Sequence, residues 1–126
     1  MKKFNAVGWF DIYVDSMERA VNFYEAVLGQ ELVEIVDPTG ETQMMSFHGD
    51  MSLYGAGGSL VKSKYSKPGV GGSMIYFSVE DCKEHEHLVT NAGGKVTRPK
   101  FSIGDYGWVT LCEDTEGNLF GLSSMK

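Results

Sequence analysis

The chain has 126 residues, of which 42% are hydrophobic and 22% charged, and its formal net charge at pH 7 is −6. These values suit one globular domain with its own core, and the acidic balance argues against nucleic acids or anionic membranes as partners. No apolar run reaches the length of a membrane span, no signal peptide is evident, and the two cysteines lack CxxC spacing. We therefore expect a cytoplasmic protein with reduced thiols and with no nucleic-acid or membrane partner.

The first predicted strand covers residues 9–14, whose side chains alternate between two faces. One face is apolar, and the other carries Trp9, Asp11 and Tyr13. A helix is expected next, because Asp15 and Ser16 are both suitable N-cap residues and an apolar stripe with helical spacing follows them. Gly29 stands where a helix C-terminus favours a left-handed residue. Three strand-like segments, separated by turn signals, then lead to a polar, glycine-rich stretch.

The second half of the chain repeats this order. A shift of 65 residues places Met74 on Trp9, Phe77 on Ile12 and Gly94 on Gly29. Each half changes from a period of 2 to a period of 3.6 at the same offset. The strand face that matches Trp9, Asp11 and Tyr13 carries Met74, Tyr76 and Ser78.

The repeat predicts an α+β protein of two paired βαβββ modules that form a curved mixed sheet around a cavity. Module one covers about residues 5–62, a linker about 63–71, and module two about 72–124. A four-stranded sheet with one helix behind it leaves its other face uncovered, and two such units can pair those faces. The linker is long enough for the modules to pair within one chain or between two chains.

Five phrases occur in order along this repeat: WFDIYVDSMERAVNFYEAVLG, GGSLV, MIYFSVEDC, NAGGKV and DTEGNLFGL. Together they resemble the vicinal oxygen chelate superfamily, which includes glyoxalase I, extradiol dioxygenases, fosfomycin-modifying enzymes and bleomycin-binding resistance proteins. The resemblance covers about residues 5–124 and implies a glyoxalase-like fold. It also implies a homodimer, since members of this size commonly pair about a two-fold axis.

The resemblance also implies where a metal ion would bind. In metal-dependent members the ligands come from the first and last strands of each module. The corresponding positions here are Trp9, Met74, Gly121, and either Gly58 or Leu60. None of these side chains suits a divalent cation, which needs imidazole, carboxylate or thiolate ligands. We therefore expect no metal at the family position and no cofactor. The three histidines are interpreted as surface or partly buried side chains.

The remaining candidates are the residues expected to line the cavity. Alternation and the resemblance select Trp9, Asp11, Tyr13, Met74, Tyr76, Ser78 and Gly121. The large side chains either fill the space or form the apolar walls of a ligand pocket. Asp11 is the candidate catalytic residue, because a carboxylate among aromatic groups has to be paired, hydrated or shifted in pKa. A salt bridge from Asp11 to Arg98 or a lysine is the competing interpretation.

Two classes of function follow, and the sequence leaves open whether the protein is an enzyme. The first is a metal-free protein, similar to bleomycin-binding members, that binds a small organic molecule between the modules. Aromatic walls would stack a planar ligand and Asp11 would pair with its cationic or amine group. The alternative is a lyase- or isomerase-type enzyme of the same superfamily, either metal-independent with acid–base chemistry by Asp11 and Tyr13 or Tyr76, or with an atypical metal site. A third option is a degenerate superfamily member with only a structural or partner-binding role.

Overall fold

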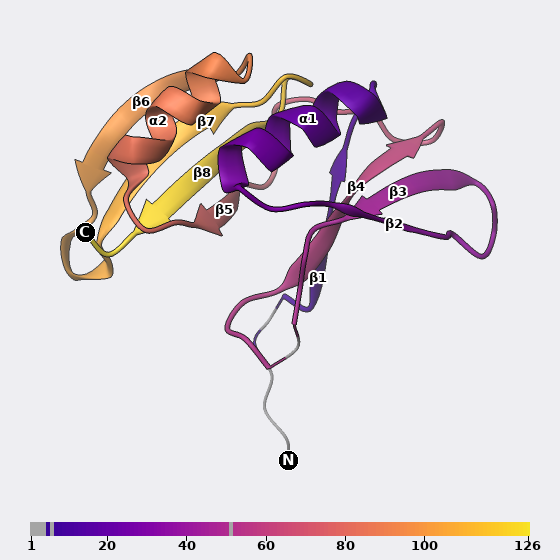
Figure 1. The fold of residues 1–126 in the computed structure, drawn as a ribbon, viewed down its shortest axis with the longest axis horizontal. Helices are drawn as coiled ribbons and strands as arrows, with labels where there is room; N and C mark the ends of the chain where they lie inside the picture. The colour runs from indigo at the N-terminus through magenta and orange to yellow at the C-terminus, as the bar shows by residue number, and fades with distance from the viewer. Residues whose placement is uncertain (1–4, 6, 51) are drawn as a thin grey trace.

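The computed structural model describes residues 5, 7–50 and 52–126. Its elements follow the predicted order of a strand, a helix and three strands, twice over (Figure 1). The first module contains β1 (Trp9–Tyr13), α1 (Met17–Leu28), β2 (Val33–Ile35), β3 (Thr42–Ser46) and β4 (Gly57–Ser63). The second contains β5 (Ile75–Ser78), α2 (Cys82–Asn91), β6 (Lys95–Ser102), the short helix η1 (Gly104–Tyr106), β7 (Trp108–Glu113) and β8 (Leu119–Ser124). The predicted α+β class with two repeated modules is confirmed.

Each module forms one four-stranded mixed sheet. The strand orders are β1-β4-β3-β2 and β5-β8-β7-β6, so the two sheets have the same topology. In each sheet the first and last strands of the module are parallel neighbours, and the other pairs are antiparallel. Asp11 lies opposite Ser59 in the first sheet, and Tyr76 lies opposite Gly121 in the second.

Side-chain caps start both helices. Of the two candidates for α1, Ser16 is the N-cap, and its hydroxyl accepts a hydrogen bond from the backbone N–H of Arg19. Gly29 ends α1 with φ of 66°, a left-handed conformation that glycine adopts without steric cost. Asp81 caps α2 by accepting from the backbone N–H of Lys83.

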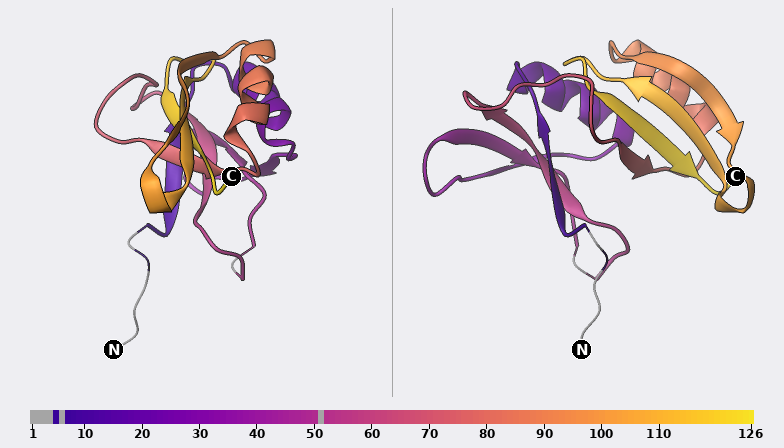
Figure 2. Two further views of the ribbon diagram at one scale, coloured as in Figure 1. Left: turned by 90° about the vertical axis from the view of Figure 1, so that its left-hand side faces the viewer. Right: turned by 180° about the vertical axis from the view of Figure 1, so that it is seen from behind.

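The two modules share one aromatic core. In the side view of Figure 2 both helices lie on one side of the sheets, and the loop between β4 and β5 lies on the other. The Tyr24 ring of α1 is 5.5 Å from Phe47 in module one and 5.7 Å from both Phe77 and Phe120 in module two, centroid to centroid. Phe10 also contacts Phe77, at 6.1 Å. These buried and partly buried aromatic side chains therefore join the modules beneath α1.

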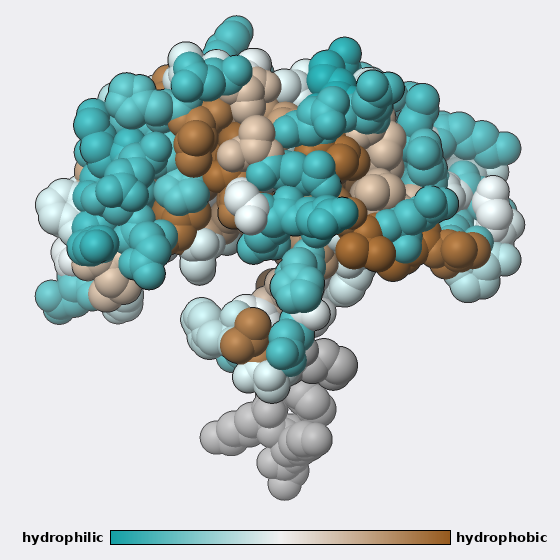
Figure 3. Space-filling model, in the orientation of Figure 1, coloured by the Kyte–Doolittle hydropathy of each residue, from teal (hydrophilic) through white to brown (hydrophobic). Residues whose placement is uncertain are grey.

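The surface on the helix side is mainly hydrophilic (Figure 3). Hydrophobic residues gather over β2 in this view, where Val33 and Val36 are exposed. Neither α1 nor α2, nor any other helix in the described part of the chain, combines the length and apolar character needed to cross a membrane.

Candidate functional site

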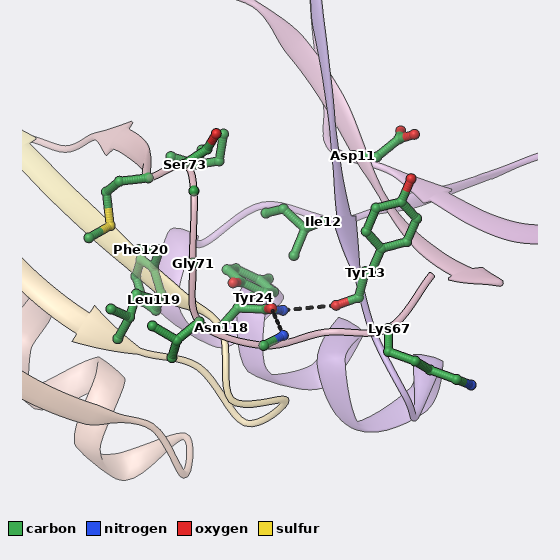
Figure 4. A pocket seen from close by; sticks show the side chains of 15 residues that line it. Asp11, Ile12, Tyr13, Tyr24, Lys67, Gly71, Ser73, Asn118, Leu119 and Phe120 are labelled. Carbon is green, nitrogen blue, oxygen red and sulfur yellow. Dashed lines mark hydrogen bonds between the residues drawn. The ribbon is translucent and has the colours of Figure 1, made fainter. Parts of the chain in front are cut away.

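A pocket of about 580 Å³ lies between β1, the loop that joins the modules, and the start of β8 (Figure 4). Asp11 and Tyr13 line it from module one, and Met74 and Leu119 line it from module two. The buried Tyr24 of α1 also borders the pocket. The volume is within the range of about 300–1,000 Å³ that is typical of small-molecule sites.

The alternation of β1 directs Trp9, Asp11 and Tyr13 to one face, away from the buried face that carries Ile12. The indole N–H of Trp9 donates to Asp11 Oδ1 at 3.0 Å, and the Ser59 hydroxyl donates to the same oxygen at 3.3 Å. These two bonds orient the carboxylate. Among the described residues, no hydrogen bond reaches Asp11 Oδ2, so this oxygen is available to a ligand.

The expected salt bridge of Asp11 does not form with Arg98 or with any lysine that the structure describes. The ion pairs between described residues do not include Asp11. Arg98 instead lies over the Phe101 ring, 3.5 Å from its centroid. Lys67 borders the pocket, but its side chain points away from Asp11 and Tyr13 (Figure 4). The negative charge on this wall of the pocket is therefore not neutralised by either cation.

The predicted site residues do not all line this pocket. Asp11, Tyr13 and Met74 meet there. Trp9 is 47% exposed and borders a neighbouring hollow with Ser46 and Gly57, so it does not fill buried space. The Tyr76 ring covers Gly121 on the free face of the second sheet and is 51% exposed. Ser78 lies at the far end of β5, in a separate hollow.

The fourth family position was misplaced. Both Gly58 and Leu60 face the core: a Cβ atom on Gly58 would lie 2.5 Å from the Phe10 ring, and Leu60 is fully buried. Because Asp11 pairs with Ser59 as Tyr76 pairs with Gly121, Ser59 is the counterpart of Gly121. A serine hydroxyl is outside the ligand set that zinc and related ions favour, so the correction adds no ligand of that kind.

Within the described residues there is no group of three or more His, Cys, Asp or Glu side chains placed to hold a metal ion. His85 uses Nδ1 in a 2.9 Å hydrogen bond with the Val27 carbonyl, which joins α2 to α1. Both cysteines are buried free thiols. Burial raises the pKa of Cys112 to about 12, which keeps it protonated and unreactive at neutral pH.

The turn between β7 and β8, Asp114–Asn118, belongs to the site although its sequence indicated only a turn. Asn118 lines the pocket and donates from Nδ2 to the backbone carbonyl of Tyr13 at 2.8 Å. Its Oδ1 accepts from the backbone N–H of Gly69 at 2.8 Å. The Tyr24 hydroxyl donates to the buried Asp114 at 2.6 Å. Burial and the Asp114 carboxylate raise the pKa of Tyr24 well above its ordinary value.

Glu116, in the same turn, binds the start of α1. It accepts hydrogen bonds from the backbone N–H groups of Asp15 and Ser16 and from two nitrogens of Arg19, at 2.6–3.0 Å. Burial opposes ionisation of this carboxyl, but the hydrogen bonds from Arg19, Ser16, Thr115 and Asp15 outweigh it and lower the pKa of Glu116 to about 2. The turn of module two is thus fixed to module one by partly buried polar contacts.

The family model of the Glyoxalase/Bleomycin resistance protein/Dioxygenase superfamily matches residues 6–122. No match was found among the curated proteins.

Solved structures resemble the whole chain. TnmS3, an antibiotic binding protein from Streptomyces sp. CB03234, has a TM-score of 0.68 and 22% identity, with 98% of each chain covered. A superfamily member from Sphaerobacter thermophilus has a TM-score of 0.69 and 23% identity, covering 96% of this chain and 98% of that one. Glyoxalase I from Zea mays has a TM-score of 0.70 and 18% identity, covering 93% of this chain and 45% of that one. These likenesses show a common fold.

Proposed function

Because the chain belongs to the Glyoxalase/Bleomycin resistance protein/Dioxygenase superfamily, we propose that it binds a small organic cation beside β1, without a metal ion. The observation that carries the proposal is the oriented carboxylate of Asp11, which lies between Trp9 and Tyr13 on one face of β1 and borders the pocket. The binding of antibiotics by TnmS3, which has the same fold over its whole length, supports a binding function.

The proposed recognition uses two kinds of contact. A protonated amine would donate to Asp11 Oδ2, and this charge-assisted hydrogen bond is stronger than a neutral one. The Tyr13 ring would contact the face of a planar ligand, where a positive charge adds a cation–π attraction. Met74 and Leu119 supply apolar surface on the opposite wall. The net charge of −6 attracts cations over longer distances.

The test is a calorimetric titration with three ligands that share one ring system. At neutral pH 9-aminoacridine is a cation, acridine is neutral and acridine-9-carboxylate is an anion. We expect 9-aminoacridine to bind with the highest affinity and acridine-9-carboxylate with the lowest. Equal affinities, or a preference for the anion, would contradict the proposal, and so would the absence of saturable 9-aminoacridine binding.

Asp11→Asn tests the residue assignment. We expect it to weaken 9-aminoacridine binding by roughly tenfold, which corresponds to the loss of one charge-assisted contact, and to leave acridine binding unchanged. Asp105→Asn is the matched control, because it removes the same charge from the exposed η1 turn, away from the pocket. If both variants weaken binding equally, the effect comes from net charge and not from Asp11.

If the protein is instead a lyase- or isomerase-type enzyme, Asp11 and Tyr13 are the acid–base pair that the pocket provides, whereas Tyr76 lies outside it.

We also propose a homodimer, which the exposed Val33 and Val36 support as an apolar contact surface. Sedimentation equilibrium tests this directly, and a single monomeric species at micromolar concentration would contradict it.

A further inference from the structure

One wall of the pocket has no regular secondary structure. Residues 69–73, which lie in the loop between β4 and β5, form this wall. Gly72 has φ of 72°, a conformation that favours glycine. Within this segment, one hydrogen bond joins the backbone N–H of Ser73 to the carbonyl of Gly71. That local bond does not set the distance between the segment and β1.

A contact that does set this distance comes from Asn118. Its Oδ1 accepts from Gly69 N–H, and its Nδ2 donates to the Tyr13 carbonyl, both at 2.8 Å (Figure 4). A carboxamide can do both at once because it carries an acceptor and two donor hydrogens. An aspartate, leucine or alanine at this position could not make both bonds. One side chain therefore connects the loop wall to the strand that carries Asp11 and Tyr13.

Asn118 is itself held in place from the core. Asp114 accepts from the backbone N–H of Asn118 at 2.9 Å and from its Nδ2 at 3.2 Å. Asp114 is in turn bonded to the Tyr24 hydroxyl in the buried interior. A continuous path of hydrogen bonds thus runs from the shared aromatic core, through the β7–β8 turn, to both walls of the pocket.

We propose that Asn118 is a positioning residue of the pocket: it holds residues 69–73 at a fixed distance from β1 and so sets the shape of the space offered to a ligand. The ligand part of this inference rests on the proposed function, whereas the structural part does not. Removing the carboxamide releases the loop wall, and a ligand then has to order it on binding.

Hydrogen exchange tests the structural part without any ligand. In the unmutated protein, the Gly69 amide should exchange more slowly than those of Val70 and Gly71, as measured by NMR. In Asn118→Ala, we expect exchange of the Gly69 amide to rise by about tenfold, in line with the loss of one hydrogen bond. Asn91→Ala, at the exposed end of α2, is the control and should leave the loop unchanged. An unprotected Gly69 amide in the unmutated protein would overturn the inference even if Asn118→Ala does not fold.

Titration with 9-aminoacridine tests the ligand part. We expect Asn118→Ala to weaken binding about three- to tenfold, although this substitution leaves the charge of Asp11 unchanged. If the Gly69 amide exchanges at the same rate in Asn118→Ala and in the unmutated protein, the inference is overturned. It is also overturned if that amide exchanges faster in Asn118→Ala while the affinity for 9-aminoacridine stays the same. If the unmutated protein does not bind 9-aminoacridine, the proposed function fails, and the exchange rates alone decide whether Asn118 holds the loop.

Discussion

Asp11 lies between Trp9 and Tyr13 on β1, and two hydrogen bonds hold one oxygen of its carboxylate. The period of 2 in a strand places Trp9, Asp11 and Tyr13 on one face, and the structure has them there. The hydrogen-bond partner of the carboxylate could not be predicted, because it depends on side-chain rotamers and on strand register. Trp9 and Ser59 donate to Asp11, while Arg98, named in the competing interpretation, stacks on Phe101.

Glu116 and Asn118 were missed for a different reason. The sequence DTEGN is typical of a turn, and it forms one. The partners of its side chains lie about a hundred positions earlier in the chain, at Asp15, Ser16 and Tyr13. Local patterns carry no information about such pairs, so polar residues in a turn give no signal that they fix two modules together.

The low pKa of Glu116 leads to a prediction about pH. The folded-state pKa of about 2 is below the ordinary value of 4.5, so the ionised form stabilises the folded state. This contribution is present above pH 4.5 and is lost as the pH falls toward 2. We expect Glu116→Gln to reduce the free energy of unfolding by about 2 kcal/mol at pH 7, and by about half as much at pH 3, in urea titrations.

Glu18→Gln provides the control for Glu116→Gln, because Glu18 is an exposed carboxylate in the first turn of the same helix. Its effect should stay within about 0.5 kcal/mol at both pH values. A loss of stability in Glu116→Gln that is the same at pH 7 and pH 3 would show that the carboxylate charge is not the cause.

At the scale of elements, the helices were predicted best. Caps and a terminal glycine are local signals, and Ser16 and Gly29 of α1 occupy the expected positions. The register of β4 was predicted wrongly, because the adjacent Gly57 and Gly58 show no alternation of side chains to fix it. The structure places Ser59, and not Gly58 or Leu60, opposite Asp11.

Gly58 and Gly121 both lie under aromatic rings, but replacing them with alanine should destabilise the protein to different extents. The Phe10 ring above Gly58 packs between Phe47 and Phe77, so an added methyl group has to displace core side chains. We expect Gly58→Ala to lower the free energy of unfolding by about 2 kcal/mol. Gly121→Ala should cost less than about 1 kcal/mol, because the half-exposed Tyr76 ring can swing away. Urea unfolding of both variants checks this order, and the reverse order would contradict the assigned register.

At the scale of the whole molecule, the repeat predicted two modules but not how they meet. The structure joins them through rings from both halves and through the β7–β8 turn. These contacts combine residues distant in sequence, which periodicity does not reveal. They also explain why the pocket lies at the junction, where neither module alone supplies both walls.

The shared core predicts cooperative unfolding. Phe77 lies within 5.5–6.1 Å of rings in both modules. We expect Phe77→Ala to lower the free energy of unfolding by about 3 kcal/mol. Trp9 reports on module one and Trp108 on module two, so fluorescence of the Trp108→Phe and Trp9→Phe proteins follows each module separately. The midpoints of the unfolding transitions followed by Trp9 and by Trp108 should shift together.

Phe101→Ala is the comparison for Phe77→Ala, because Phe101 contacts Arg98 on β6 and lies outside the shared core. It should cost less, because Phe101 lacks the ring contacts that Phe77 makes with Tyr24, Phe47 and Phe120. A Phe77→Ala protein in which only the Trp108 transition moves would show that the modules unfold independently, against the account of a common core.

The most direct test of the central claim is a titration of chelator-treated protein with 9-aminoacridine, in the absence and then in the presence of added Zn²⁺. The account predicts saturable binding of one ligand per chain, with the same affinity in both conditions, because Asp11 and not a metal ion holds the amine. Binding that appears only after Zn²⁺ is added would contradict it.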